Sequence, residues 1–295
     1  MSKKLVLLVA VLTIASLAFA QAPSTRVPLH RDLSAARHDV QGAMADNLIA
    51  PSTITCAASY ASGTGERHTT DCVTVNGNIT EFSVNNEEMI NQGVVDEGYG
   101  ICDFSTGVSY YDYGANDSGN LLASSFTTPT AKTAVSTRIS SDGIWQITNT
   151  ITQTFATATA PGKVTAKTVL KNLTGISRTV FFLRHADLDA NADPSHNDFD
   201  WGVNSAFGIF NGTFNGTSTS KGYGLAMLDA SYSGTGGTNQ NFYTLNTFAG
   251  PTNVCNPFPN ISVQPFSGDG SLMGLFGVAV PAHGSKTFTV TYQPL

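Results

Sequence analysis

The chain has 295 residues, with 15 basic and 21 acidic side chains and a formal net charge of −6. Beyond Lys3 and Lys4, its lysines and arginines are scattered singly, so it lacks the basic patch that nucleic-acid binding requires. This composition excludes a nucleic-acid partner, and the length is sufficient for one large all-β domain with a buried core.

Residues 1–20 have the pattern of a cleavable secretory signal. Lys3 and Lys4 give a positive start, the stretch Leu5–Leu17 is almost wholly apolar, and Ala18–Ala20 has the small-x-small form that signal peptidase accepts. The apolar stretch is shorter than the ~20 residues that a membrane-spanning helix needs. We therefore expect cleavage near Ala20 and a secreted protein, extracellular or periplasmic, without a membrane span.

The region that follows, residues 21–52, is predicted to be an N-terminal leader. Apolar residues recur there at three- and four-residue steps, and Pro51 ends the pattern; they are Leu33, Ala36, Val40, Met44 and Leu48. This spacing predicts a short amphipathic helix. A leader that orders only on a partner is the alternative, because the apolar face is rich in alanine.

Four cysteines follow the signal: Cys56, Cys72, Cys102 and Cys255. An even number in an exported chain indicates two disulfides, for which three pairings exist. Cys56 and Cys72 flank a glycine-rich turn at residues 61–65, and a hairpin would bring them opposite each other. We therefore prefer Cys56 with Cys72 and Cys102 with Cys255.

From Pro51 onward the hydrophobic period changes to two, which is typical of strands with one buried face. Residues 145–155 alternate in this way and should pair with residues 134–140 across a turn at Ser141–Gly143. Further strands are expected at 164–170, at 178–189, and after the turn at Pro281–Ser285. With 28 glycines, 12 prolines and 12% charged residues, the sequence predicts an all-β domain over residues 53–295. We expect an antiparallel β-sandwich with long meandering strands, and its general architecture resembles that of secreted bacterial β-sandwich proteins.

One segment, residues 184–201, is rich in groups that bind metals. Asp187, Asp189, Asn191 and Asp193 stand two residues apart, and Asp198 follows. Their oxygens suit Ca²⁺, which takes six to eight oxygen ligands, so we predict a calcium site there. Two alternatives stay open. One is a loop of Asx turns, in which each side chain binds its own backbone. The other is a transition-metal site that uses His185 and His196.

A second set of acids could line a sugar-binding cleft. Asp96, Glu97, Asp103 and Asp112 lie near aromatic residues, and the full aromatic set is Tyr99, Tyr110, Tyr111, Tyr113 and Trp201. A glycosidase needs two carboxyl groups at a defined separation, which a sequence does not supply. Paired tyrosines in a strand more often reflect cross-strand packing.

No motif of a familiar hydrolase, P-loop or dinucleotide-binding protein is present. The first hypothesis for function is therefore a non-enzymatic secreted protein that binds a carbohydrate or a cell-surface ligand, or is surface-associated, stabilised by Ca²⁺. The alternative is a carbohydrate-active enzyme of β-sandwich architecture, with acids drawn from Asp96, Glu97, Asp187 and Asp189.

Overall fold

The computed structural model describes residues 55–90, 97–114, 116–190, 193–201, 204–211, 213–214, 217–218, 224–229 and 239–295. Within these ranges the regular structure is antiparallel β-strand apart from one 3-10 turn, η2 (Gly65–Arg67). No helix in these ranges is long and apolar enough to cross a membrane. The predicted signal at 1–20 and the predicted helix at 33–48 lie outside the described residues.

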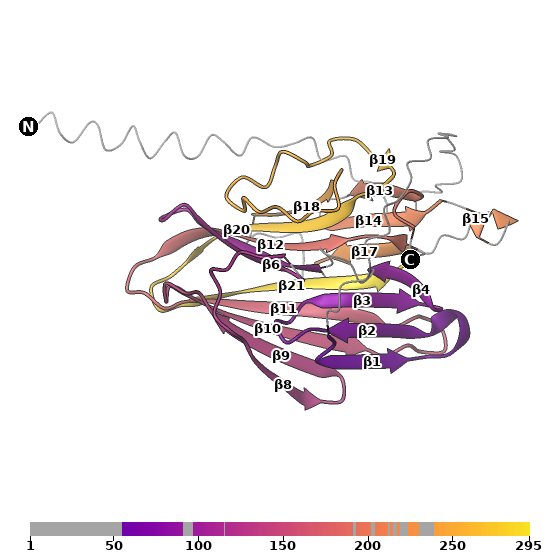
Figure 1. Ribbon diagram of the computed structural model, residues 1–295, viewed down its shortest axis with the longest axis horizontal. Coiled ribbons are helices and arrows are strands. Elements are labelled where there is room, and N and C mark those ends of the chain that lie inside the picture. Colours follow the sequence, from indigo (N-terminus) through magenta and orange to yellow (C-terminus); the bar gives the residue numbers. More distant parts are fainter. Residues whose placement is uncertain are drawn as a thin grey trace, which may run out of the picture. The chain divides into compact units, whose positions relative to one another are not determined.

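The described strands form two large sheets and two smaller ones (Figure 1). The nine-stranded sheet has the order β19 (Phe266–Ser267), β13 (Asn197–Trp201), β14 (Ser205–Phe210), β17 (Gly224–Leu228), β21 (Ser285–Pro294), β11 (Lys163–Asn172), β10 (Trp145–Thr154), β9 (Thr133–Ile139), β8 (Ser125–Thr130). The six-stranded sheet has the order β18 (Asn239–Leu245), β20 (Ser271–Val280), β12 (Arg178–Asp187), β5 (Glu97–Asp103), β6 (Val108–Tyr113), β7 (Asn116–Asp117). The four-stranded sheet contains β1 (Ala58–Ser62), β2 (Thr69–Val73), β3 (Ile79–Val84) and β4 (Glu87–Ile90), and the last pair is β15 (Thr213–Phe214) with β16 (Thr217–Ser218).

The main core lies between the two large sheets. Phe182 of β12 stacks on Phe288 of β21 with ring centroids 4.3 Å apart, and Phe276 of β20 lies 5.3 Å from Phe288. Along β10, odd-numbered side chains are buried and even-numbered ones are half-buried or exposed, as the period of two predicts. Burial of each such phenylalanine contributes roughly 2 to 3 kcal/mol. The predicted antiparallel β-sandwich is confirmed.

The chain moves from one large sheet to the other between β11 and β12. Strands β8 to β11 follow each other as neighbours, as expected of a meander, and β9 pairs with β10 as predicted. β11 then pairs with β21, whereas β12 pairs with β5 and β20. Asn172 fixes the connecting turn, because its amide donates to the Ile176 carbonyl at 2.6 Å and its oxygen accepts from the Thr174 N–H at 2.9 Å.

The four-stranded sheet covers part of the nine-stranded sheet, over β9 and β10 (Figure 1). At one end, a Cβ on Gly77 would lie 2.8 Å from the Asn149 Cβ and 3.0 Å from the Ser136 Cβ. At the other end, the Ala156 N–H donates to the Ser62 Oγ at 3.1 Å. Gly77 has φ +81°, so both its backbone conformation and the close approach of the sheets require glycine.

Both predicted disulfides are present. Cys56 and Cys72 have Cα atoms 5.3 Å apart, and Cys102 and Cys255 have Cα atoms 4.8 Å apart. The second bridge ties the segment before β19 to β5, beside a second buried cluster made of Cys102, Tyr113, Leu183, Leu245, Val254, Met273 and Leu275. Two disulfides and no free cysteine are typical of proteins in an oxidising compartment outside the cytoplasm.

Candidate functional site

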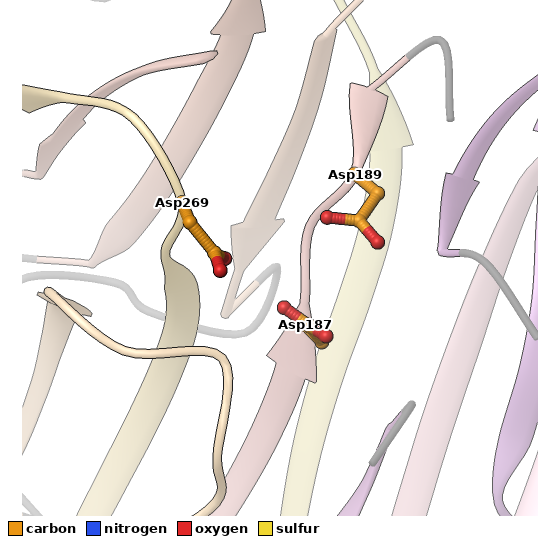
Figure 2. Close-up of side chains that lie close together, drawn as sticks. All are labelled: Asp187, Asp189 and Asp269. Carbon is orange, nitrogen blue, oxygen red and sulfur yellow. The ribbon is translucent and has the colours of Figure 1, made fainter. Parts of the chain in front are cut away.

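Three aspartates gather where β12 ends and β20 begins. Asp187, Asp189 and Asp269 each place a carboxylate oxygen within 4.8 Å of the others. Asp187 and Asp189 are half-buried and Asp269 is exposed. Figure 2 shows Asp187 and Asp189 on one segment and Asp269 on the neighbouring one, with their carboxylate groups turned toward a shared space.

Backbone pairing produces this arrangement. Asp187 is the last residue of β12 and is paired with Ser271, the first residue of β20. The Leu188 N–H donates to the Gly270 carbonyl at 3.3 Å, which holds the two segments together beyond the strands. A Cβ on Gly270 would lie 2.6 Å from the Phe266 ring and 2.8 Å from the Leu245 carbonyl oxygen, so only glycine fits the turn that presents Asp269.

Three carboxylates at this separation are chemically suited to a hard cation. Two oxygens that bind the same Ca²⁺ at 2.3 to 2.6 Å lie within about 5 Å of each other. Carboxylates of like charge repel at this range, and a divalent ion converts the repulsion into attraction. The group can therefore supply part of an oxygen shell, with water or backbone carbonyls as further ligands.

The five residues predicted as metal ligands do not all gather in this group. Asp187 and Asp189 belong to it, whereas Asn191 lies outside the described residues. Asp193 accepts hydrogen bonds from the Ser195 N–H at 3.0 Å and from the Ser195 hydroxyl at 2.7 Å, which is an Asx turn. Partial burial alone would raise the pKa of Asp193. The hydrogen bonds from Ser195 and the neighbouring His196 lower this pKa by more, so the net shift is downward. Asp198 on β13 accepts hydrogen bonds from Asn211 and Ser267.

The two histidines considered as transition-metal ligands lie apart from the aspartate group. The His196 Nδ1 is 2.8 Å from a carboxylate oxygen of Asp193, and the side chain is about half exposed. His185 is fully buried on β12, and its ring centroid lies 5.4 Å from that of Tyr113. Burial lowers the pKa of His185 to about 3, so the ring is neutral at ordinary pH.

The acids considered for a sugar cleft are buried in ion pairs wherever the structure describes them. Glu97 pairs with Arg184 through both carboxylate oxygens, Asp103 pairs with Arg178 at 2.6 Å, and Asp112 pairs with Arg138 at 2.5 Å. Glu97, Asp103 and Asp112 are each 0% exposed. Asp96 lies outside the described residues. Of the aromatic set, Tyr99, Tyr110 and Tyr113 are buried, and Tyr111 and Trp201 are half-buried.

Glu97 and Asp187 also face opposite sides of the six-stranded sheet. Glu97 is the direct partner of Ala186 across β5 and β12, so these two side chains share the core face. Asp187 is the next residue along β12 and points to the other face. Glu97 therefore cannot act with Asp187 as the carboxylate pair of one active site.

Sequence reasoning missed Asp269. It lies about 80 positions after Asp187 and Asp189 in the chain, and the pairing of β12 with β20 brings it to them. Its local signal is an acid between two glycines, Gly268 and Gly270, at the start of a strand. That signal indicates a tight turn but not its partner, because strand order in a sheet is nonlocal.

No family model matches the chain, and no curated protein matches it in sequence. Solved structures do match its fold. A bacterial glucoamylase in complex with acarbose aligns over 82% of this chain at 10% identity with a TM-score of 0.50, and the chain spans 32% of the glucoamylase. A putative aldose 1-epimerase from Escherichia coli K12 aligns over 81% of this chain and 99% of its own, at 10% identity and a TM-score of 0.42. A galactose mutarotase related enzyme from Lactobacillus acidophilus aligns over 81% and 97%, at 6% identity and a TM-score of 0.42. At such identities the likeness to the glucoamylase is one of fold, and the fold is the β-sandwich.

Proposed function

We propose that this chain is an exported bacterial β-sandwich protein with a non-enzymatic binding or surface-associated role, stabilised by Ca²⁺ at Asp187, Asp189 and Asp269. The signal-like residues 1–20 and the two disulfides support export. The observation that carries the calcium site is the set of three carboxylates, drawn from two segments, with oxygens within 4.8 Å of one another.

The non-enzymatic role is favoured over catalysis because the other acids considered for a sugar cleft are buried in structural ion pairs. Glu97, Asp103 and Asp112 are fully buried in ion pairs and have no contact with solvent. A general acid or a nucleophile must reach its substrate. The group at Asp187 is then better suited to holding an ion that joins the ends of β12 and β20.

The calcium site is tested by thermal unfolding of the metal-stripped protein with and without added Ca²⁺. An ion that binds only the folded chain at one hundred times its dissociation constant stabilises it by about 2.7 kcal/mol. This gain should raise the melting midpoint by several degrees, at roughly 2 to 4 °C per kcal/mol. Mg²⁺ should substitute poorly, because it demands a tighter octahedral shell.

Variants separate the observed group from the set that the sequence predicted. Asp187→Asn and Asp269→Asn should each remove most of the calcium shift, whereas Asp198→Asn should keep it. A melting curve that does not respond to millimolar Ca²⁺ would leave an ordinary turn as the better account. Loss of the shift in Asp198→Asn, with retention in Asp269→Asn, would favour the loop of residues 187–198 as the site.

The alternative, a carbohydrate-active enzyme, is tested with the oxidised mature protein against a panel of polysaccharides. We expect no turnover. The decisive control is the double variant Asp187→Asn/Asp189→Asn, since these are the two acids of the proposed catalytic set that lie together. Turnover that the double variant abolishes would replace the non-enzymatic role with an enzymatic one.

A further inference from the structure

Apart from the aspartates at the end of β12, a cluster of polar side chains is buried where the four-stranded sheet meets the nine-stranded sheet. Asp71 on β2 is 2% exposed, and Tyr60, directly opposite it on β1, is 9% exposed. Within the described part of the chain, neither carboxylate oxygen of Asp71 nor the Tyr60 hydroxyl has a hydrogen-bond partner. A buried carboxylate in this position is costly unless a proton or a counter-ion neutralises it.

Gln153 of β10 is the matching group on the nine-stranded sheet. It is 1% exposed, and neither its amide nitrogen nor its amide oxygen has a hydrogen-bond partner among the described residues. Alternation along β10 places Gln153 on the same face as Asn149. Asn149 lies beneath Gly77 and its amide donates to the Asn76 carbonyl at 3.5 Å, so this face of β10 looks toward the four-stranded sheet.

The same reasoning puts Asp71 on the face of β2 that looks toward the end of β10 containing Gln153. Asp71 shares its face with Thr69, whose hydroxyl lies 2.9 Å from the Ser62 hydroxyl, and Ser62 accepts the hydrogen bond from Ala156. The segment 69–77 therefore runs along the segment 149–156 in the opposite chain direction. Along these segments, Asp71 lies two residues after Thr69, and Gln153 lies three residues before Ala156.

No basic group neutralises Asp71 in the described residues: the ion pairs there use other acids. The titratable groups around it are Tyr60 on β1 and Glu81 on β3, while β10 contributes the neutral Gln153. Burial, and to a lesser extent the charge of Glu81, raise the pKa of Asp71 from 3.8 to about 8. Burial and the charge of Asp71 raise the pKa of Tyr60 as well.

In the ranges that the structure describes, no hydrogen bond joins Asp71, Gln153 and Tyr60. We propose that, when Asp71 is protonated, small side-chain rotations close a hydrogen-bonded latch between Asp71 and Gln153 that holds the four-stranded sheet on β10. As a neutral acid, Asp71 donates its hydroxyl hydrogen to the amide oxygen of Gln153 and accepts from the amide nitrogen. Its second lone-pair site accepts from the Tyr60 hydroxyl. Every unpartnered atom of the group then has a partner, because a carboxylic acid and an amide have complementary donors and acceptors. The ionised carboxylate has no proton to donate and repels the amide oxygen.

The sign of the pH effect follows from linkage. The folded protein holds the Asp71 proton more tightly than the unfolded chain does, so the stabilisation by this proton is complete below pH 3.8 and is lost as the pH rises through about 8. Between pH 6 and pH 9 the unfolding equilibrium should shift toward the open state about 100-fold from this group. Opening should begin with β1 to β3, which carry one side of the latch.

Two measurements test the latch on the oxidised full-length mature protein. Infrared spectroscopy of the wild type should show a protonated-carboxyl C=O component that disappears with a midpoint near the pKa of about 8 and is absent from Asp71→Asn. Glu88 and Asp112, whose pKa values burial raises to about 7, contribute a separate component that Asp71→Asn keeps. Amide hydrogen exchange of β1 to β3, corrected for intrinsic rates, should accelerate about 100-fold from pH 6 to pH 9 in the wild type.

Asp71→Asn keeps the shape and cannot ionise, so its corrected exchange should lose the part of the pH response whose midpoint lies near 8. The part with a midpoint near 7, from Glu88 on β4 of the same sheet, should remain. Glu66→Gln is the control, because Glu66 is exposed on η2 in the same sheet hairpin, and this variant should retain the wild-type response. Absence of a protonated-carboxyl component with a midpoint near 8 overturns the proposal without any variant. A wild-type pH response in Asp71→Asn overturns it as well.

Discussion

Replacement of Arg184 by methionine should test what holds the three sheets together. The Arg184 guanidinium contacts both carboxylate oxygens of Glu97 and donates to the Gly77 carbonyl at 3.1 Å. Glu97 also accepts from the Tyr292 hydroxyl at 2.6 Å and from the Ile79 N–H at 2.7 Å. Arg184 lies on the six-stranded sheet, Tyr292 on the nine-stranded sheet and Ile79 on the four-stranded sheet. The ion pair is thus the point where all three meet.

The expected loss is large because both side chains are 0% exposed. Arg184→Met keeps the apolar stem but leaves the Glu97 carboxylate buried without a counter-ion. Removal of one partner of a buried pair costs about 3 to 5 kcal/mol. The double variant Arg184→Met/Glu97→Gln removes both charges, and its loss should be smaller than the sum of the two single losses by about 2 kcal/mol or more.

Urea unfolding at pH 7 measures these losses as shifts of the midpoint at constant slope. Lys167→Met, on an exposed position of β11, is the control and should change the free energy of unfolding by less than about 0.5 kcal/mol. A loss below about 1 kcal/mol for Arg184→Met would refute the argument, and so would strict additivity in the double variant.

Three further predictions concern the backbone and the processing of the chain. The Cys102–Cys255 bridge closes a loop of 153 residues and Cys56–Cys72 one of 16, so in the chain-entropy model Cys102→Ala should cost about 2 kcal/mol more than Cys56→Ala in urea unfolding. Equal costs would contradict that model. Gly77→Ala combines a left-handed φ with a steric overlap and should lose about 2 to 4 kcal/mol, whereas Gly119→Ala, which has a similar φ but open space, should lose about 1 to 2 kcal/mol. The exported protein should begin at Gln21, which N-terminal sequencing checks; an uncleaved N-terminus would contradict the predicted signal.

The local features of this fold could be predicted from the sequence. The alternation in residues 145–154 marks β10 because one face is buried and one is not. The glycine-rich turn between Cys56 and Cys72 identified a hairpin and its disulfide. Strand order could not be predicted in the same way. Nothing near Asn172 indicates that β12 leaves the sheet of β11, since that choice depends on strand partners about 80 to 130 residues away.

The site was predictable only in part for a related reason. β5 is buried along its whole length, so its sequence has no alternation to reveal that Glu97 and Asp103 point into the core. Their basic partners, Arg184 and Arg178, lie on β12, and a sequence does not state that β5 and β12 are neighbours. Asp187 and Asp189 were identified from their spacing, whereas their third neighbour, Asp269, depends on sheet register.

The position of β21 has a consequence for when the molecule can fold. This strand, residues 285–294, lies in the interior of the nine-stranded sheet, between β11 and β17. During synthesis, both neighbours exist as open edges until these late residues arrive, and the Tyr292 contact to Glu97 is absent until then. Contacts of such long range close slowly. Completion of the nine-stranded sheet therefore waits for residues 285–294, and a chain truncated before them would expose two unpaired strand edges to other chains.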